Sequence, residues 1–516
     1  MIEKYYDGAI EQVAAGLGTV EKNYLLVRYS GQFSVENLND TKQLEKNEDI
    51  FVQVHEFETG EITCAYEPYL TMICDGFRRY MTGTFEEFME TCDVYYLHRP
   101  VLLGYFNQDN TGREEIILLD EVAYEQERML AALERMLCAI ADRHPVLFVL
   151  NRFQLASKST MQLTARFLKC ENCNIGLVLG VSDIQAMPEF LVPDWEMLYE
   201  TLDDGSKIYH IGNSGRKKEE TIDDEKYVDY GSEKVYRKLQ NMVEFLDFDQ
   251  AAYYLETIER KIKFDNLLVD DAARFRMWLL FVKVSILRQD IPKALEICED
   301  LEKIHLAGKE EECAYEQDYL IATAYMYQGK LKEALEMAGE TYRIAGKMSD
   351  DYRMFLSELL EAKIQMSGWY NIFFCAQDVK IKESLIQNLI RYNYRNHLAH
   401  VYIYAYDNKP EIVKKANQSE ELLIYFSRGI RIAKKLGNEY LINMAYQKNI
   451  MLSSTNGMYE ISLLYSVRTY EALKDKRSIQ AGRIYSGIAY NLCAIGENEC
   501  AMAYYRHAIR LFYHLR

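Results

Sequence analysis

Residues 24–40 read YLLVRYSGQFSVENLND. The first six residues form a short apolar run, which is typical of a strand buried on both faces of a parallel sheet. A polar segment follows directly, at the place where an α/β protein can carry a phosphate-binding loop. Such a loop needs several glycines and a Gly-Lys-Ser/Thr, because backbone N–H groups and one lysine hold the phosphates. This segment has a single glycine, and no Gly-Lys-Ser/Thr occurs in the 516 residues.

Short apolar runs and amphipathic segments alternate through residues 1–212. The predicted strands are 24–29, 50–55, 146–150, 175–181 and 207–211, and the predicted helices are 68–81, 120–142 and 159–168. Alternating strands and helices predict a doubly wound parallel sheet with right-handed crossovers.

A second informative stretch is PVLFVLNRFQLAS, at residues 145–157. Nucleotide-hydrolysing α/β enzymes place a carboxylate at the end of such a strand to hold magnesium. Here the position is Asn151, followed by Arg152. An asparagine accepts a hydrogen bond but brings no charge to a metal ion. This stretch therefore argues against metal-assisted hydrolysis.

The order of these elements resembles the STAND group of AAA-like signalling ATPases. The resemblance rests on YLLVRY, IFVQVHEF (50–57), YEPYLTMICDGFRRYM (66–81), PVLFVLNRF and NIGLVLGV (174–181), and it covers most of residues 20–212. The family implies ATP hydrolysis, but here the phosphate loop and the metal-binding acid are missing. We therefore expect a degenerate site and no enzyme activity. The degenerate nucleotide-site positions are Ser30, Gly31, Ser34, Asn151 and Arg152.

A charged segment, NSGRKKEETIDDEKYVDYGSEK, follows at residues 213–234. It contains almost no aliphatic residues, so it can bury little surface and reads as an exposed connector. We therefore predict three parts: a degenerate AAA/STAND-like α/β domain at 1–212, a charged linker at 213–232 and an all-α repeat domain at 233–516.

The repeat domain is predicted from a recurring phrase, seen in DFDQAAYYLETI, QGKLKEALEMAGET and IGENECAMAYYRHAI. Aligning seven such phrases places a mostly small residue at one equivalent position, with separations of 39 to 49 residues. These positions are Ala251, Ala294, Ala334, Phe373, Val413, Ser462 and Ala501. A nearly fixed period predicts stacked helical hairpins similar to tetratricopeptide (TPR) repeats, though longer than the usual ~34 residues. Gly329, Gly368, Gly457 and Gly496 lie five residues earlier, in the expected turn.

Stacked hairpins form a superhelix with a concave surface that can hold a peptide or a partner helix. The candidate groove residues are Glu316, Tyr319, Thr323, Met326, Arg483, Ser486 and Tyr490. The alternative for each aromatic residue is that it fills the core between neighbouring repeats.

The charge, apolar runs and cysteines of the sequence argue against several classes of protein. A net charge of −19 and a pI near 5.1 argue against a general nucleic-acid surface. No apolar run is long enough to span a membrane, and the start lacks the pattern of a signal peptide. Eleven cysteines without a framework favour reduced thiols in a cytoplasmic protein. The pair Cys170 and Cys173 lacks further zinc ligands nearby and is interpreted as a loop, so no metal or cofactor is expected.

These observations favour a non-catalytic signalling or scaffold protein that binds a protein or peptide through its helical repeats. The family resemblance implies a regulatory setting in a bacterium. One alternative is a switch that binds nucleotide without hydrolysing it, or a transcription regulator that acts with an output domain on a partner chain. Another alternative is an enzyme of a different type, which would need a pocket of clustered acid and base residues.

Overall fold

The computed structural model describes residues 2–19, 23–29, 49–58, 61–109, 112–113, 115–118, 121–170, 172, 174–182, 187–202, 208–211, 229–265, 267–304, 306–366, 383–404, 419–455, 457–472 and 479–514. The chain forms two compact units, Met1–Leu320 and Ile321–Arg516. The boundary between them falls inside helix α13 (Glu310–Gln328). Within the described residues, no helix combines the length and the apolar character needed to cross a bilayer.

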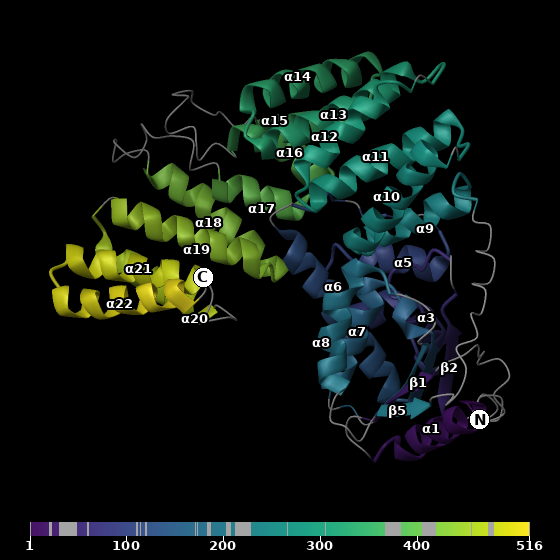
Figure 1. The fold of residues 1–516 in the computed structure, drawn as a ribbon. Coiled ribbons are helices and arrows are strands. Elements are labelled where there is room, and N and C mark those ends of the chain that lie inside the picture. Colours follow the sequence, from purple (N-terminus) through teal and green to yellow (C-terminus); the bar gives the residue numbers. More distant parts are fainter. Residues whose placement is uncertain are drawn as a thin grey trace. The chain divides into compact units, whose positions relative to one another are not determined.

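Within the described residues, five parallel strands form the sheet of the first unit, in the order β2-β3-β4-β1-β5. Figure 1 labels β1, β2 and β5 of this sheet. The strands are β1 (Tyr24–Tyr29), β2 (Phe51–Glu56), β3 (Val146–Asn151), β4 (Ile175–Ser182) and β5 (Ile208–Ile211). All five predicted strands are confirmed, and each end agrees within one residue. The predicted parallel sheet is therefore confirmed, with β4 inserted between β3 and β1.

Helices cover both faces of this sheet. They are α1 (Ile2–Gly16), α3 (Tyr69–Tyr80), α4 (Phe85–Thr91), α5 (Arg99–Asn107), α6 (Val122–Ala141), α7 (Lys158–Lys169) and α8 (Val192–Leu202). Ile10 of α1 packs in one core cluster with Val149 of β3. The neighbouring Phe148 points to the other face, where its ring centroid lies 4.7 Å from that of Tyr69 in α3. Alternation along β3 thus buries both faces, as the continuous apolar run predicts.

The three predicted helices of this region are confirmed as α3, α6 and α7. The helices α1, α4, α5 and α8 were not among the predictions. Helices α4 and α5 have only 7 and 9 residues, so each gives a short periodic signal. The capping box of α4, in which Thr84 and Glu87 exchange hydrogen bonds, is a sequence signal that could have located its start.

The described residues from 229 onward form helices and no strands, which confirms the predicted all-α character of the second part. The helices are α9 (Glu233–Glu244), α10 (Phe248–Phe264), α11 (Asp271–Leu287), α12 (Ile291–Leu301), α13, α14 (Leu331–Lys347), α15 (Asp351–Met366), α16 (Glu383–Arg391), α17 (Arg395–Tyr404), α18 (Ser419–Leu436), α19 (Glu439–Thr455), α20 (Tyr459–Ala472), α21 (Ile479–Ala494) and α22 (Asn498–His514). Helices α9 to α12 belong to the same unit as the sheet. Most of the predicted linker, residues 213–228, lies outside the described residues, so the predicted domain limits stay a prediction.

The predicted turn glycines adopt the left-handed backbone. Gly329, Gly457 and Gly496 have φ values of 81°, 73° and 91°, while Gly368 lies outside the described residues. At the equivalent turns of the first unit the left-handed residues are Leu246 and Gln289, with φ values of 66° and 63°. These two turns lack glycine, so they could not be located from a glycine in the sequence.

The aligned small position is buried wherever the structure describes it. Ala251, Ala294, Ala334, Ser462 and Ala501 are all 0% exposed. Phe373 and Val413 lie outside the described residues. A small side chain at this position allows its helix to pack closely on its neighbours, which explains why small residues recur there.

We expect Ala334→Leu to destabilise the protein by about 1–3 kcal/mol, because extra methyl groups in a filled core force neighbouring side chains apart. Glu336→Leu on the same helix is the control, since Glu336 is exposed and the change should stay within about 0.5 kcal/mol. Urea denaturation of both variants measures the difference. Equal denaturation midpoints would show that the position is not tightly packed.

Candidate functional site

The carboxyl ends of the strands bring together the residues expected to form a nucleotide site. Parallel strands end at the same edge, so Tyr29, Glu56, Asn151 and Ser182 lie at one edge of the sheet. Glu56 is in register with Asn151, and Tyr29 is in register with Ser182. Ser30, Gly31 and Ser34 fall outside the described residues, so their predicted role stays a prediction.

Asn151 is fully buried at this edge. Its Oδ1 accepts a hydrogen bond of 2.7 Å from the Tyr29 hydroxyl, and the side chain is 0% exposed. Burial raises the pKa of Tyr29 to about 12, although the contact with Asn151 acts to lower it. The phenol therefore remains a neutral donor near pH 7. A neutral hydrogen bond thus occupies position 151, which is predicted from the sequence to be the degenerate metal position.

Two further contacts connect the same strand ends. Arg152, which has a left-handed φ of 53°, places its Nε 3.3 Å from Glu56 Oε1. Gln154 donates from Nε2 to the Ser182 carbonyl at 3.1 Å and accepts from the Ser182 N–H at 3.3 Å. We call Tyr29, Glu56, Asn151, Arg152, Gln154 and Ser182 the strand-end cluster. Its polar groups are engaged with one another.

The strand-end cluster is poorly suited to holding a metal ion. A divalent cation such as Mg²⁺ is usually bound through carboxylates, and the only carboxylate of this cluster, Glu56, is paired with Arg152. Among the described residues, no group of three or more His, Cys, Asp or Glu side chains is placed to bind a metal ion.

We expect Asn151→Asp to destabilise the protein by about 1–3 kcal/mol, because it places a carboxylate in a fully buried position. Asn498→Asp at the exposed start of α22 is the matched control, and it should change stability by less than about 0.5 kcal/mol. Urea denaturation measures both. A stable Asn151→Asp protein that also releases phosphate from ATP would contradict our interpretation of this edge.

The comparisons with known proteins rest on structure. No family model and no curated protein matches the chain. One similar solved structure is a Signal Transduction ATPase with Numerous Domains (STAND) protein with a tetratricopeptide repeat sensor from Pyrococcus horikoshii. It has a TM-score of 0.45 and 10% identity, and the match covers 95% of this chain and 87% of that chain.

Two further similar structures are of the quorum sensor NprR. The apo form from B. thuringiensis has a TM-score of 0.38 and 15% identity, over 54% of this chain and 74% of that chain. NprR in complex with its cognate peptide NprX has a TM-score of 0.36 and 15% identity, over 54% of this chain and 79% of that chain. The STAND protein is of the kind that the sequence resembles.

The predicted groove residues lie on α13 and α21. On α13, Glu316, Tyr319 and Thr323 are half-buried, and Met326 is only 8% exposed, so little of its side chain is available to a ligand. On α21, Arg483 is exposed and Ser486 is half-buried. Tyr490 is 55% exposed, which makes it the most accessible aromatic side chain of the predicted set.

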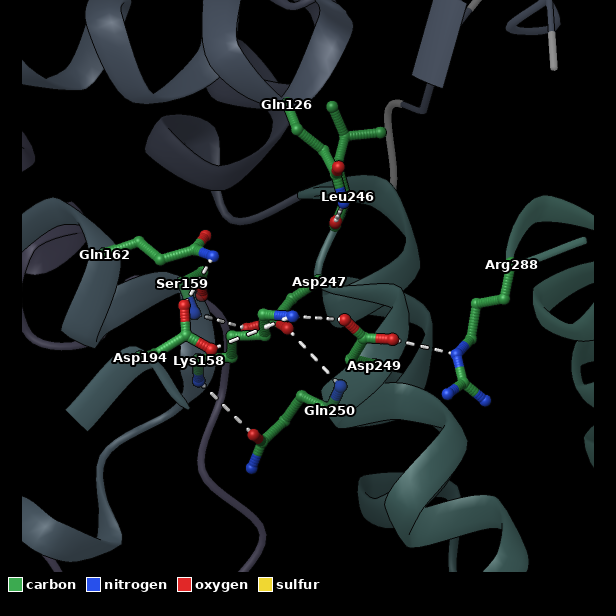
Figure 2. A network of polar contacts seen from close by, with 10 residues as sticks. All are labelled: Gln126, Lys158, Ser159, Gln162, Asp194, Leu246, Asp247, Asp249, Gln250 and Arg288. Atoms are coloured by element: carbon green, nitrogen blue, oxygen red, sulfur yellow. Dashed lines mark hydrogen bonds and ion pairs between the residues drawn. The ribbon is translucent and has the colours of Figure 1, made fainter. Parts of the chain in front are cut away.

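A polar network that the sequence did not predict joins α7 to α10 (Figure 2). Asp247 caps α10 by accepting from the Gln250 N–H at 3.4 Å, and its second oxygen accepts from the Ser159 N–H of α7 at 3.0 Å. Asp247 is 4% exposed. Burial raises its pKa, although the hydrogen bonds from Ser159 and Gln250 act in the opposite direction. One carboxylate thus serves the first turns of two helices.

Charged side chains extend this network. The Lys158 ammonium contacts Asp249 and lies 3.8 Å from Asp194, while Arg288 Nε donates to Asp249 at 2.8 Å. Burial alone would raise the pKa of Asp249, but Lys158 and Arg288 lower this pKa below its ordinary value. We call Lys158, Ser159, Asp194, Asp247, Asp249 and Arg288 the α7–α10 junction. It connects α7, α8, α10 and α11.

The α7–α10 junction borders a small cavity of about 70 Å³. Tyr66, Gln126 and Gln162 also line it. Gln126 Nε2 donates to the Leu246 carbonyl at 2.8 Å, next to the left-handed turn before α10. The cavity has room for a few water molecules at most, so the junction is suited to holding helices together and not to binding a substrate.

Proposed function

We propose that this chain is a non-catalytic signalling or scaffold protein that binds a protein or peptide partner through its helical repeats. The observation that carries the non-catalytic part is the buried hydrogen bond between Tyr29 and Asn151 at the expected metal position. The cytoplasmic setting and the regulatory role belong to the same proposal. The described cysteines are free thiols, which fits a reducing compartment.

The α7–α10 junction supports a role for the α/β region as a base for the first repeat helices. Asp247 and Asp249 of α10 are bound by Ser159 and Lys158 of α7. A second set of contacts lies nearby, where Lys238 of α9 donates to Glu61 at 2.8 Å and to the Ile62 carbonyl at 2.7 Å. These contacts support a structural role of the α/β region toward α9 and α10.

The catalytic part of the proposal is tested with the full chain, ATP and Mg²⁺. We expect no phosphate release above that of the buffer. Calorimetry with ATP, ADP and GTP addresses the alternative switch: no heat of binding supports the scaffold, whereas saturable binding without turnover would favour the nucleotide-binding switch.

The binding part is tested by selecting peptides from a displayed random library on the full chain. We expect Tyr490→Ala to weaken binding of a selected peptide at least about tenfold, since exposed tyrosines are frequent anchors of interfaces. Tyr513→Ala on α22 is the matched control, because Tyr513 is also exposed, at 77%, but was not predicted to line the groove. Fluorescence polarisation measures both affinities.

Two results would contradict the proposal that the repeats bind a peptide. If no peptide is enriched over a control protein, the repeats do not act as a peptide receptor. If Tyr513→Ala abolishes binding while Tyr490→Ala does not, the partner occupies a different surface from the predicted groove.

A further inference from the structure

Two cysteines from neighbouring helices are in contact in the α/β region. Cys138 lies in the last turn of α6, and Cys170 is the residue that ends α7. Their sulfur atoms are 3.8 Å apart, and both side chains are half-buried thiols. A disulfide has an S–S distance of about 2.05 Å, so the two sulfurs need to approach by about 2 Å. The pair is therefore close to bonding geometry.

We propose that Cys138 and Cys170 are a redox modification site, at which a small-molecule disulfide of the glutathione class oxidises both thiols to a reversible disulfide. In the sequence, Cys170 is spaced as a Cys-x-x-Cys with Cys173, and this segment is interpreted as a loop. Cys173 lies outside the described residues, whereas Cys138 is in α6 and Cys170 directly follows α7. The inference is independent of the partner-binding proposal.

The chemistry is a balanced exchange of two electrons. The Cys170 thiolate attacks one sulfur of the small disulfide, which forms a mixed disulfide and expels one small thiolate. The Cys138 thiolate then attacks the Cys170 sulfur and expels the second small thiolate. The two protons released by the protein thiols are taken up by the two small thiolates. Burial and the adjacent Cys170 raise the pKa of Cys138, which lowers its thiolate fraction, so the second step is slower than it would be for an unperturbed thiol.

Other contacts hold α6 and α7 side by side. Arg166 of α7 donates from Nε to Glu134 at 2.7 Å and from Nη1 to Glu127 at 2.7 Å. Beyond the end of α7, Asn172 Nδ2 donates to Asp142 at 3.0 Å. These contacts flank the two cysteines along the same pair of helices. They keep the sulfurs near one another in the reduced protein, which favours a disulfide between Cys138 and Cys170 over other pairings.

The disulfide would affect the helices that support the repeats. Each of α6 and α7 has its cysteine near its C-terminal end and a contact to the turn before α10 near its N-terminal end. In α6, Gln126 donates to the Leu246 carbonyl, and in α7 the Ser159 N–H donates to Asp247. A covalent bond at the cysteine ends closes a loop of 33 residues and restricts the unfolded chain. Oxidation should therefore stabilise α6 and α7 as one platform.

The experiment treats the full chain with oxidised glutathione, blocks the remaining thiols, and maps disulfides by mass spectrometry of a non-reduced digest. We expect a peptide pair linked through Cys138 and Cys170, and a rise in Tm on the order of 5 °C that dithiothreitol reverses. Cys138→Ser and Cys170→Ser should each abolish the linked pair. Cys173→Ser should leave both the linked pair and the Tm rise intact.

Three results would overturn the proposal. The first is a disulfide between Cys170 and Cys173, which would show that the nearby sequence pair is the reactive one. The second is glutathione attached to Cys170 with no bond to Cys138. The third is modification of the exposed Cys493 and Cys500, which confirms that the oxidant is active, while Cys138 and Cys170 remain thiols.

Discussion

Glu125→Ala is expected to destabilise the protein by about 3–5 kcal/mol, because it removes the carboxylate from a buried charge cluster. Glu125 is 0% exposed, and its Oε2 lies 3.0 Å from Nε2 of the equally buried His98. Its other oxygen accepts a hydrogen bond from Arg128, whose guanidinium also lies 4.4 Å from the centre of the Tyr95 ring. Without Glu125, the largely buried Arg128 loses its nearer carboxylate and keeps the more distant Glu121, whose Oε2 lies 3.9 Å from Arg128 Nη1.

The charge state of this cluster follows from its surroundings. Burial lowers the pKa of His98, so the imidazole is neutral at pH 7. Burial raises the pKa of Glu125, but His98 and Arg128 lower it by more, so that this pKa lies below its ordinary value. Glu125 therefore carries a negative charge that Arg128 balances, and the alanine variant disturbs a buried ion pair.

Glu127→Ala provides the matched control for Glu125. Glu127 is on the same helix and also pairs with an arginine, Arg166, but its side chain is 56% exposed. An exposed pair contributes at most about 1 kcal/mol. Urea denaturation of the full chain, followed by circular dichroism, measures the free energy of unfolding of both variants. Similar losses in the two variants would show that the buried cluster contributes no more than a surface ion pair.

Asp247→Ala is expected to cost about 2–4 kcal/mol, because it removes the hydrogen bonds of two helix starts at a buried position. The Ser159 N–H and the Gln250 N–H both lose their acceptor, and Asp247 is only 4% exposed. Hydrogen exchange should rise in the first turns of both α7 and α10. Denaturation with urea gives the size of the loss.

Asp290→Ala separates the two roles of Asp247. Asp290 caps α12 in the same way, accepting from the Lys293 N–H at 3.2 Å, but it is exposed and serves one helix. Its loss should cost about 1 kcal/mol, the usual value for a single cap. If Asp247→Ala costs no more than Asp290→Ala, or leaves exchange in α7 unchanged, the carboxylate does not join the two helices.

The sequence predicted those parts of the fold that repeat or run continuously. The five strands were located because strands buried on both faces are uninterrupted apolar runs. The repeat position was located because the packing of each hairpin demands a small side chain, and Ala294 and Ala501 are fully buried there. Asn151 was singled out correctly as a strand-end residue, since the end of an apolar run marks the edge of the sheet.

The contacts between distant segments could not be predicted in the same way. Ser159 and Asp247 are 88 residues apart, and nothing in either local pattern shows that their helices start beside one another. The same holds for His98 with Glu125 and for Cys138 with Cys170. Hydrophobic periodicity reports which side of a helix is buried, but not which other helix covers it.

The hydrogen bond between Tyr29 and Asn151 also makes it difficult for this protein to acquire a metal site by stepwise substitution. A designer who wished to install a magnesium site would need an acid at position 151, a new loop after β1 and a replacement for the Tyr29 hydroxyl. The acid alone is unfavourable, because it is buried against that phenol before any metal ion can neutralise it. We therefore expect the substitution at position 151 alone to lower the stability of the protein. A magnesium site would require all three changes together.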